Sequence, residues 1–384
     1  MRDIILVVVV IGLCGLSMRR PFYGVLLITW LGHMSPQTFT WGFSKTLPFV
    51  AMAVICTMVG LLMTKDRTSP PNNTCLWILI VFILWVSLST IFALYPEQTD
   101  EYSRFIKIQF TVLLILILVK KKEEIIALIT TIAFSIGFFG IKGGLFTVAT
   151  AGSYRVWGPD GTFIMVVPFF YFLSGSFENK RLKQFLVACL ILCVISSIGS
   201  QSRGAFLALI ATSCFLWTKS SNKGMLAFLA LILIIFGSFF IPEAWFSRME
   251  TIETYDEDAP NPEFVFDAHS IYFEILGEQG FGGLLIFISM FLSTWLLNNK
   301  TSNLAKDHQG LKWASNLALM INVSFVAYAS GGAFLGLAYW DLPYQLVAIS
   351  AILNSVVINS DEIKKKTINK IEKQLITTHT QRDQ

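Results

Sequence analysis

Apolar runs alternate with short polar links along most of this chain of 384 residues. A helix needs about 20 predominantly apolar residues to cross the hydrocarbon core of a bilayer, and many of the runs approach that length. The pattern therefore predicts an all-α, polytopic bundle of transmembrane helices with about 12–13 spans. The first two runs are short and are expected to form a hairpin or tilted half-spans. The runs lie at 4–17, 21–35, 46–64, 75–94, 104–119, 124–148, 163–177, 184–200, 204–218, 224–241, 271–297, 313–335 and 344–357.

Composition agrees with a membrane protein. Hydrophobic residues make up 54% of the chain and charged residues only 14%, which leaves too little polar surface for a water-soluble globule of this size. The formal net charge of +4 is small and does not indicate a nucleic-acid partner. The six cysteines lie in or beside apolar runs without the spacing of a zinc site.

Lysine and arginine cluster in every second link, and cytoplasmic links hold these residues in excess. Those links and the polar tail, 361–384, are therefore predicted to be cytoplasmic, whereas residues 1–360 form one membrane domain. The remaining links are predicted to face outward, toward the periplasm if the chain lies in a bacterial inner membrane. They are 36–45, 95–103, 149–162, 200–203, 242–270 and 336–343, of which 242–270 is the longest.

Few positively charged residues remain on the predicted outward side, namely Lys45, Lys142, Arg155, Arg203 and Arg248. Arg203 follows Ser202 where one apolar run ends and the next begins almost without a loop. A planar guanidinium at this level suits a phosphate or pyrophosphate, which it binds in a bidentate manner. An ordinary interfacial arginine that extends to water is the alternative.

Arg155 lies in the outward segment AGSYRVWGPDGTF, beside Tyr154 and Trp157. Turn formation alone explains the Gly-Pro-Asp-Gly part of this segment. Arg155 has two possible roles at this stage: it contacts a substrate sugar, or it anchors the segment at the membrane interface.

His269 stands at the outward start of an apolar run, in the segment AHSIYFEILGEQGFGG. A neutral imidazole is well suited to accept a proton from a hydroxyl at neutral pH. Ser270 is its neighbour, and Glu274 and Glu278 follow at i, i+4 spacing, so that polar groups form one stripe on the helix. A purely structural histidine is the alternative. The four glycines of the segment, at 277, 280, 282 and 283, are expected to let a neighbouring helix approach closely.

Two motifs resemble one known family. His269-Ser270, nine residues, then Gly280 and Gly283 match the pattern H-[N/S/Q]-x9-G-x-x-G of the O-antigen ligase and polymerase superfamily. The Ser-Arg-Gly at 202–204 resembles the second signature of that superfamily. The segments RRPFYGVLLITWLGHMSPQTFTWGF, GIKGGLFTVATAGSYRVWGP and GGAFLGLAYWDLPYQLV further resemble the O-glycosylation ligases associated with exosortase A systems.

This resemblance implies transfer of a glycan from an undecaprenyl-diphosphate carrier to a hydroxyl of an acceptor protein or lipid, on the periplasmic face and without metal or cofactor. It implies that Arg203 binds the carrier diphosphate and that His269 activates the acceptor or organises the site. Arg155 and Arg248 are expected to assist in binding the diphosphate, with Ser202, Ser270 and Glu274 in supporting positions. A single in-line displacement would invert the anomeric carbon.

Four alternatives remain at this stage. A polymerase of the same superfamily differs from a ligase only in its acceptor. A transporter or lipid-carrier flippase would place charged residues in the middle of its spans and contain opposed repeats, and the sequence has neither pattern. A metal-dependent glycosyltransferase would use Asp256 and Asp258 as cation ligands. Finally, the stretch from Asp258 to Asp267 is shorter than the resemblance implies, which fits an inactive structural member of a secretion complex.

Overall fold

The computed structural model describes residues 1–64, 69–93, 99–156, 162–219 and 269–364, and in this part of the chain every regular element is a helix. Twelve of the thirteen apolar runs form helices, and the thirteenth, 224–241, lies outside the described residues. The α-helices are α1 (Arg2–Arg19), α2 (Pro21–Met34), α3 (Phe49–Met63), α4 (Thr74–Ile91), α5 (Thr99–Leu118), α6 (Lys122–Ala149), α7 (Thr162–Ser176), α8 (Lys180–Gly199), α9 (Arg203–Lys219), α12 (Ile271–Ala305), α13 (Lys312–Gly331) and α14 (Asp341–Ile358). Short 3-10 helices are η1 (Pro36–Phe39), η2 (Phe43–Thr46), η4 (Gln309–Leu311) and η5 (Gly332–Phe334).

Six helical segments among the described residues are long and apolar enough to cross a membrane: α4, α6, α8, α12, the α13 segment and α14. The helices α3 and α7 and the apolar part of α9 are also apolar but shorter. The chain is therefore a multi-pass membrane protein with an all-α fold, as predicted. The count of about 12–13 spans stays a prediction beyond these six segments.

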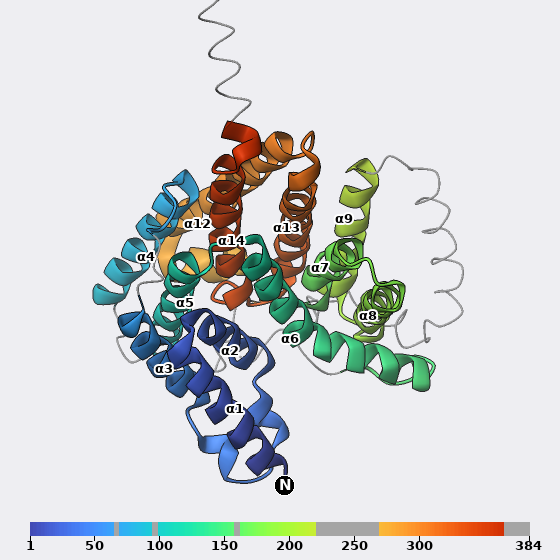
Figure 1. The fold of residues 1–384 in the computed structure, drawn as a ribbon. Helices are drawn as coiled ribbons and strands as arrows, with labels where there is room; N and C mark the ends of the chain where they lie inside the picture. Colours follow the sequence, from blue (N-terminus) through green and yellow to red (C-terminus); the bar gives the residue numbers. More distant parts are fainter. Residues whose placement is uncertain (65–68, 94–98, 157–161, 220–268, 365–384) are drawn as a thin grey trace, which may run out of the picture.

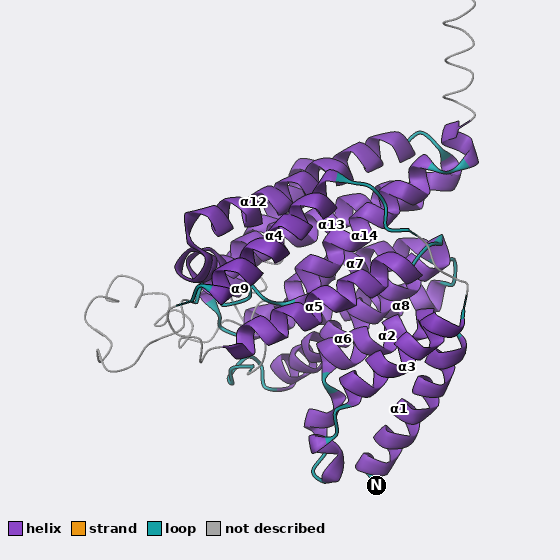
Figure 2. Ribbon diagram, turned by 90° about the vertical axis from the view of Figure 1, so that its left-hand side faces the viewer, coloured by secondary structure: helices purple, strands orange, loops and turns teal. Residues whose placement is uncertain are grey.

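The helices form three groups around the C-terminal part of the chain. In Figure 1, α12, α13 and α14 occupy the upper centre, with α4 and α5 on one side and α7, α8 and α9 on the other. The helices α1, α2 and α3 form a further group below them, and α1 and α2 make the predicted hairpin by turning at Arg20. The long helix α6 connects this group to α8, against which it packs along much of its length. Figure 2 shows that many of the long helices run in a similar direction.

Burial differs strongly between these apolar helices. The apolar window of α14 is 78% buried, whereas that of α12 is only 22% buried. Most residues of α14 are buried by neighbouring helices, whereas α12 exposes a stripe of large side chains to the surroundings. This stripe consists of Phe281, Leu285, Ile288, Leu292 and Leu296. Such a surface fits contact with lipid rather than with water.

Links that the sequence predicts to face outward meet at one end of the bundle. The carboxylate of Asp3 accepts hydrogen bonds from the amide of Gly42 (3.1 Å) and the hydroxyl of Ser44 (2.7 Å), which attaches the 36–48 connection to the start of α1. The ammonium of Lys142, near the end of α6, lies 5.8 Å from the ring centroid of Phe39. The first outward link and the last turns of α6 are therefore neighbours.

Links with a basic composition meet at the opposite end. The ammonium of Lys122, at the start of α6, lies 5.5 Å from the ring of Trp313 at the start of α13. His308 Nδ1 lies 3.4 Å from a carboxylate oxygen of Glu362, where the C-terminal tail begins. These contacts agree with the predicted division for the segments they join, while the alternation of all links and the side that faces the cytoplasm stay predictions.

Candidate functional site

His269 and Ser270 stand directly before α12, as the sequence predicts. Ser270 is the N-cap residue and is buried, whereas the side chain of His269 is exposed. An apolar cavity of about 220 Å³ begins at the next two residues, Ile271 and Tyr272, and continues between α12 and α13. The exposed His269 thus stands two residues before the first wall residue of this cavity in the chain.

Arg203 is the first residue of α9. The turn between α8 and α9 consists of residues 200–202 and is so tight that Gln201 adopts a left-handed conformation, with φ of +51°. The hydroxyl oxygen of Ser202 accepts a hydrogen bond from the amide of Ala205 (3.5 Å), so Ser202 caps the helix. The positive end of the helix dipole of α9 thus coincides with the predicted phosphate-binding residue.

The two motif segments contact the same short element, η5. A Cβ atom placed on Gly204 would lie 3.0 Å from the Cβ of Phe334 in η5. A Cβ atom placed on Gly332, also in η5, would lie 2.8 Å from the Cδ1 of Ile271. The start of α9 and the start of α12 are therefore brought together although 67 residues separate Arg203 from Ser270 in the chain.

Arg155 holds the α8–α9 turn in place. Its Nε donates a hydrogen bond to the carbonyl of Ser200 (2.9 Å), and the amide of the next residue, Val156, donates to the carbonyl of Gly199 (2.9 Å). The segment around Arg155 is thus attached to the turn that immediately precedes Arg203. This contact gives Arg155 a structural role, and its predicted contact with a diphosphate is not tested by it.

The two glutamates of the α12 stripe fix the connection between η5 and α14. The carboxylate of Glu274 accepts a hydrogen bond from the amide of Ala338 (3.1 Å). The carboxylate of Glu278 accepts one from the hydroxyl of Tyr339 (2.6 Å). Both glutamates therefore face the predicted outward link 336–343, and the supporting role of Glu274 in the site stays a prediction.

Gln279 extends this network to α4. Its Nε2 donates to the hydroxyl oxygen of Tyr339 (3.1 Å), and its Oε1 accepts a short hydrogen bond from Ser89. Burial raises the pKa of Tyr339 far above its usual value, and the adjacent carboxylate of Glu278 raises it further. Tyr339 consequently remains a protonated donor at every physiological pH.

Gly280 interrupts α12 with a backbone conformation of φ +67° and ψ −175°, which is accessible almost only to glycine. The indole Nε1 of Trp85 donates to the carbonyl of Gln279 (3.0 Å), the residue directly before the interruption. The prediction that all four glycines permit close approach is right for Gly282 and Gly283, whose added Cβ atoms would lie 2.6 Å and 3.0 Å from Trp85. It is wrong for Gly280 and Gly277, because no atom lies within 4 Å of an added Cβ there.

A model of a protein family of unknown function, DUF5935, matches residues 1–158. The matched part contains α1 to α6 and ends before α7, so it does not include the motifs at 202–204 and 269–283. No curated protein and no solved structure matches the chain.

Within the matched part, His33 is a polar residue of this end of the bundle that our sequence analysis missed. Its Nε2 lies 3.1 Å from the amide oxygen of Gln345, and its ring makes an edge contact with Trp340, with centroids 6.1 Å apart. Its Nδ1 is buried and has no hydrogen-bond partner among the described residues. His33 and its partners lie in segments that carry the family resemblance, WLGHM and YWDLPYQLV. Their shared presence in these segments could have indicated that they lie close together.

Two predicted site features lie outside the described residues. These are Arg248 and the acidic residues Asp256 and Asp258 of the proposed metal alternative. The described part of the chain contains no group of three or more His, Cys, Asp or Glu side chains that could hold a metal ion.

Proposed function

We propose that this membrane protein is a glycan ligase that transfers a glycan from an undecaprenyl-diphosphate carrier to a hydroxyl of a protein or lipid acceptor. The reaction takes place on the periplasmic face of a bacterial inner membrane. The observation that carries the proposal is the contact of both motif segments with η5, because it brings the start of α9 and the start of α12 to one end of the bundle. The resemblance of these segments to the O-antigen ligase superfamily supplies the reaction class.

Arg203 and the N-terminus of α9 bind the carrier diphosphate in this scheme. A helix N-terminus offers unpaired amide groups and a partial positive charge, and an arginine adds a planar pair of donors. Ser202 and Arg155 act through position, because one caps α9 and the other fixes the turn before it. Arg248 is a further diphosphate-binding residue of the proposal.

His269 accepts the proton of the acceptor hydroxyl. The acceptor oxygen then forms a bond to the anomeric carbon of the glycan, while the bond from that carbon to the diphosphate oxygen breaks and its electron pair stays on the diphosphate. The anomeric configuration is inverted because this is a single displacement. Glu274 keeps the start of α12 in register with the link 336–343, and Ser270 is the N-cap residue of this helix.

Purified protein in detergent tests the proposal, with an undecaprenyl-diphosphate-linked glycan as donor and EDTA present throughout. We expect His269→Ala to lower the transfer rate by about 10²–10⁴-fold, the usual contribution of a general base. Arg203→Ala is expected to reduce transfer to a similar degree. Matched controls are His308→Ala, at the opposite end of the bundle, and Lys45→Ala, an exposed cation of another outward link.

Transfer at the wild-type rate by the His269 variant would contradict its role as base. Transfer that EDTA abolishes would instead support the metal-dependent alternative with Asp256 and Asp258. A second lipid-linked glycan as the preferred acceptor would identify a polymerase.

A further inference from the structure

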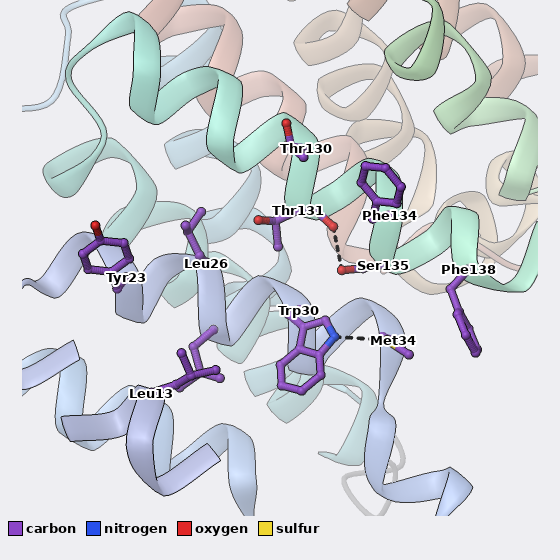
Figure 3. Close-up of a pocket in the computed structure, with 11 residues that line it drawn as sticks. Leu13, Tyr23, Leu26, Trp30, Met34, Thr130, Thr131, Phe134, Ser135 and Phe138 are labelled. Carbon is purple, nitrogen blue, oxygen red and sulfur yellow. Dashed lines mark hydrogen bonds between the residues drawn. The ribbon is translucent and has the colours of Figure 1, made fainter. Parts of the chain in front are cut away.

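A groove of about 530 Å³ lies between α1, α2 and α6, entirely within the part that the DUF5935 model matches. Figure 3 shows its walls, which include Leu13 of α1, Trp30 and Met34 of α2, and Thr131, Ser135 and Phe138 of α6. It extends along α2 from Tyr23 to Met34, a distance of about 17 Å at 1.5 Å per residue. This is about half the thickness of the hydrocarbon core of a bilayer.

Most polar groups in the wall already have hydrogen-bond partners within their own helix. The hydroxyl of Thr131 donates to the carbonyl of Ala127 (3.0 Å), and that of Ser135 donates to the carbonyl of Thr131 (2.6 Å). The indole Nε1 of Trp30 donates to the sulfur of Met34 (3.0 Å), as the dashed line in Figure 3 shows. The groove therefore offers mainly carbon surface to its occupant, and these groups require no hydrogen bond from it.

The surroundings limit the occupant to a hydrocarbon chain. The wall residues of α6 lie in the interior of an apolar helix of 28 residues that is long enough to cross the membrane. A groove at this depth is exposed to lipid rather than to water. Its walls come from the three helices α1, α2 and α6.

A cation lies at the outward end of the groove. The ring of Phe138, the last wall residue on α6, contacts the ring of Phe39, with centroids 5.6 Å apart. The ammonium of Lys142, one helical turn beyond Phe138, lies 5.8 Å from the centroid of the same Phe39 ring. Lys142 is exposed, so an anionic headgroup can reach its ammonium from the level of the outer membrane surface.

The same end of the groove is connected to the candidate site. The wall residue Met34 is preceded in the chain by His33, whose ring contacts the ring of Trp340. Trp340 adjoins Tyr339, the residue that donates to Glu278 of the motif helix. A headgroup at the mouth of the groove would therefore lie on the side of the bundle where the motif segments meet.

We propose that this groove binds the isoprenoid chain of the carrier lipid, with Lys142 paired to its phosphate. Hydrocarbon walls and a cation at one end are complementary to a long single chain that bears an anionic headgroup. The identity of this lipid as the glycan carrier rests on the proposed function, whereas the groove and its cation are independent of it.

Binding of three probes to the full-length protein in lipid nanodiscs tests the proposal: undecaprenyl phosphate, undecaprenol and phosphatidylglycerol. Lys142→Gln is expected to weaken the binding of undecaprenyl phosphate about fivefold, which is the usual contribution of one basic residue near a membrane surface. The binding of undecaprenol, which carries no charge, should stay unchanged. Thr131→Phe places a large side chain in the groove and is expected to weaken the binding of both isoprenoid probes by at least about tenfold. Lys45→Gln and Leu145→Phe are matched controls, because Lys45 is an exposed outward cation and Leu145 is a lipid-facing residue of α6 outside the groove.

Undecaprenyl phosphate binding that neither Lys142→Gln nor Thr131→Phe alters would overturn the proposal. Displacement of undecaprenyl phosphate by an equal concentration of phosphatidylglycerol would also overturn it, since the groove would then be a general lipid surface. Lys142 is exposed, so Lys142→Gln is expected to fold normally. The test therefore remains decisive even if Thr131→Phe fails to fold.

The outcome can be separated from that of the proposed function, because binding of these probes needs neither glycan nor acceptor. Groove-dependent binding without transfer to any acceptor would overturn the ligase proposal alone. Transfer with an unchanged KM for the carrier in both variants would overturn the groove proposal alone.

Discussion

A single backbone conformation at Gly280 determines how the motif helix is divided. The two parts of α12 on either side of Gly280 are helical, and the interruption lies two residues after Glu278. Trp85 of α4 stabilises the interruption from outside through the carbonyl of Gln279. The last residues before the interruption can therefore face Tyr339, while the part after it follows the direction of the bundle.

Gly280→Ala is expected to lower the free energy of unfolding by about 1–3 kcal/mol, because an L-residue is strained at a φ of +67°. The loss should appear as a lower midpoint of thermal unfolding in detergent. Transfer activity should fall as well, since the start of α12 loses its contact with Tyr339.

Gly277→Ala is the matched control for this change. Its added Cβ also meets no atom within 4 Å, but its φ is not positive, so alanine should be neutral or slightly stabilising there. Equal stability of the two variants would show that α12 continues as a regular helix through residue 280.

At the scale of elements, buried amide side chains connect α12 to α13. Asn298 Nδ2 donates to Asn322 Oδ1 (2.9 Å), and both residues are almost fully buried. Asn322 in turn donates to Asn299 Oδ1 (3.1 Å). Helices that are apolar on every side gain little specificity from hydrophobic contact in lipid, so these amides fix the register of the pair.

A double-mutant cycle with Asn298→Leu and Asn322→Leu is expected to give a coupling energy of about 0.6–1.7 kcal/mol, between the average and the maximum measured for hydrogen bonds between membrane helices. Unfolding in mixed micelles provides the four stabilities. A cycle that combines Asn298→Leu with Asn179→Ala, at the N-cap of α8, serves as control. Its two changes should be additive within about 0.5 kcal/mol because the sites share no partner. Additivity of the Asn298 and Asn322 changes as well would contradict the role of this hydrogen bond.

For the whole molecule, the alternation of links between two ends carries the functional argument. The contacts of Asp3 with Ser44 and of Arg155 with Ser200 lie in links with few positive charges. The contact of Lys122 with Trp313 lies in basic links. For these links the charge pattern and the contacts agree, and the positive-inside rule then predicts that the site end faces the periplasm.

Single cysteines introduced into a variant without the six native ones test this orientation. In spheroplasts, a membrane-impermeant maleimide should label cysteines at Lys45 and Ser153, which are exposed in outward links. Cysteines at Lys180 and Lys300, exposed near the basic links, should be labelled only after lysis. The reverse pattern would place the site on the cytoplasmic side, and labelling of Lys45 and Ser153 from different sides would contradict the arrangement.

The sequence alone determined where the helices lie and which residues begin them. Most described runs coincide with helices within about four residues, although α12 ends eight residues beyond its run and α5 begins five residues before its run. The agreement arises because the length of an apolar run is a local property that the bilayer selects. The positions of His269, Ser270 and Arg203 at helix starts were predictable for the same reason, as was the absence of a real loop before Arg203.

Only the tertiary structure decided which faces of these helices meet. Helices that are apolar all round carry no sequence signal for their buried side, so neither the groove between α1, α2 and α6 nor the burial of α14 could be predicted. The contact of His33 with Gln345 joins residues 312 positions apart, and that of Glu278 with Tyr339 joins residues 61 apart. Such polar pairs form where close packing excludes water, and this packing is a property of the assembled bundle rather than of any one segment.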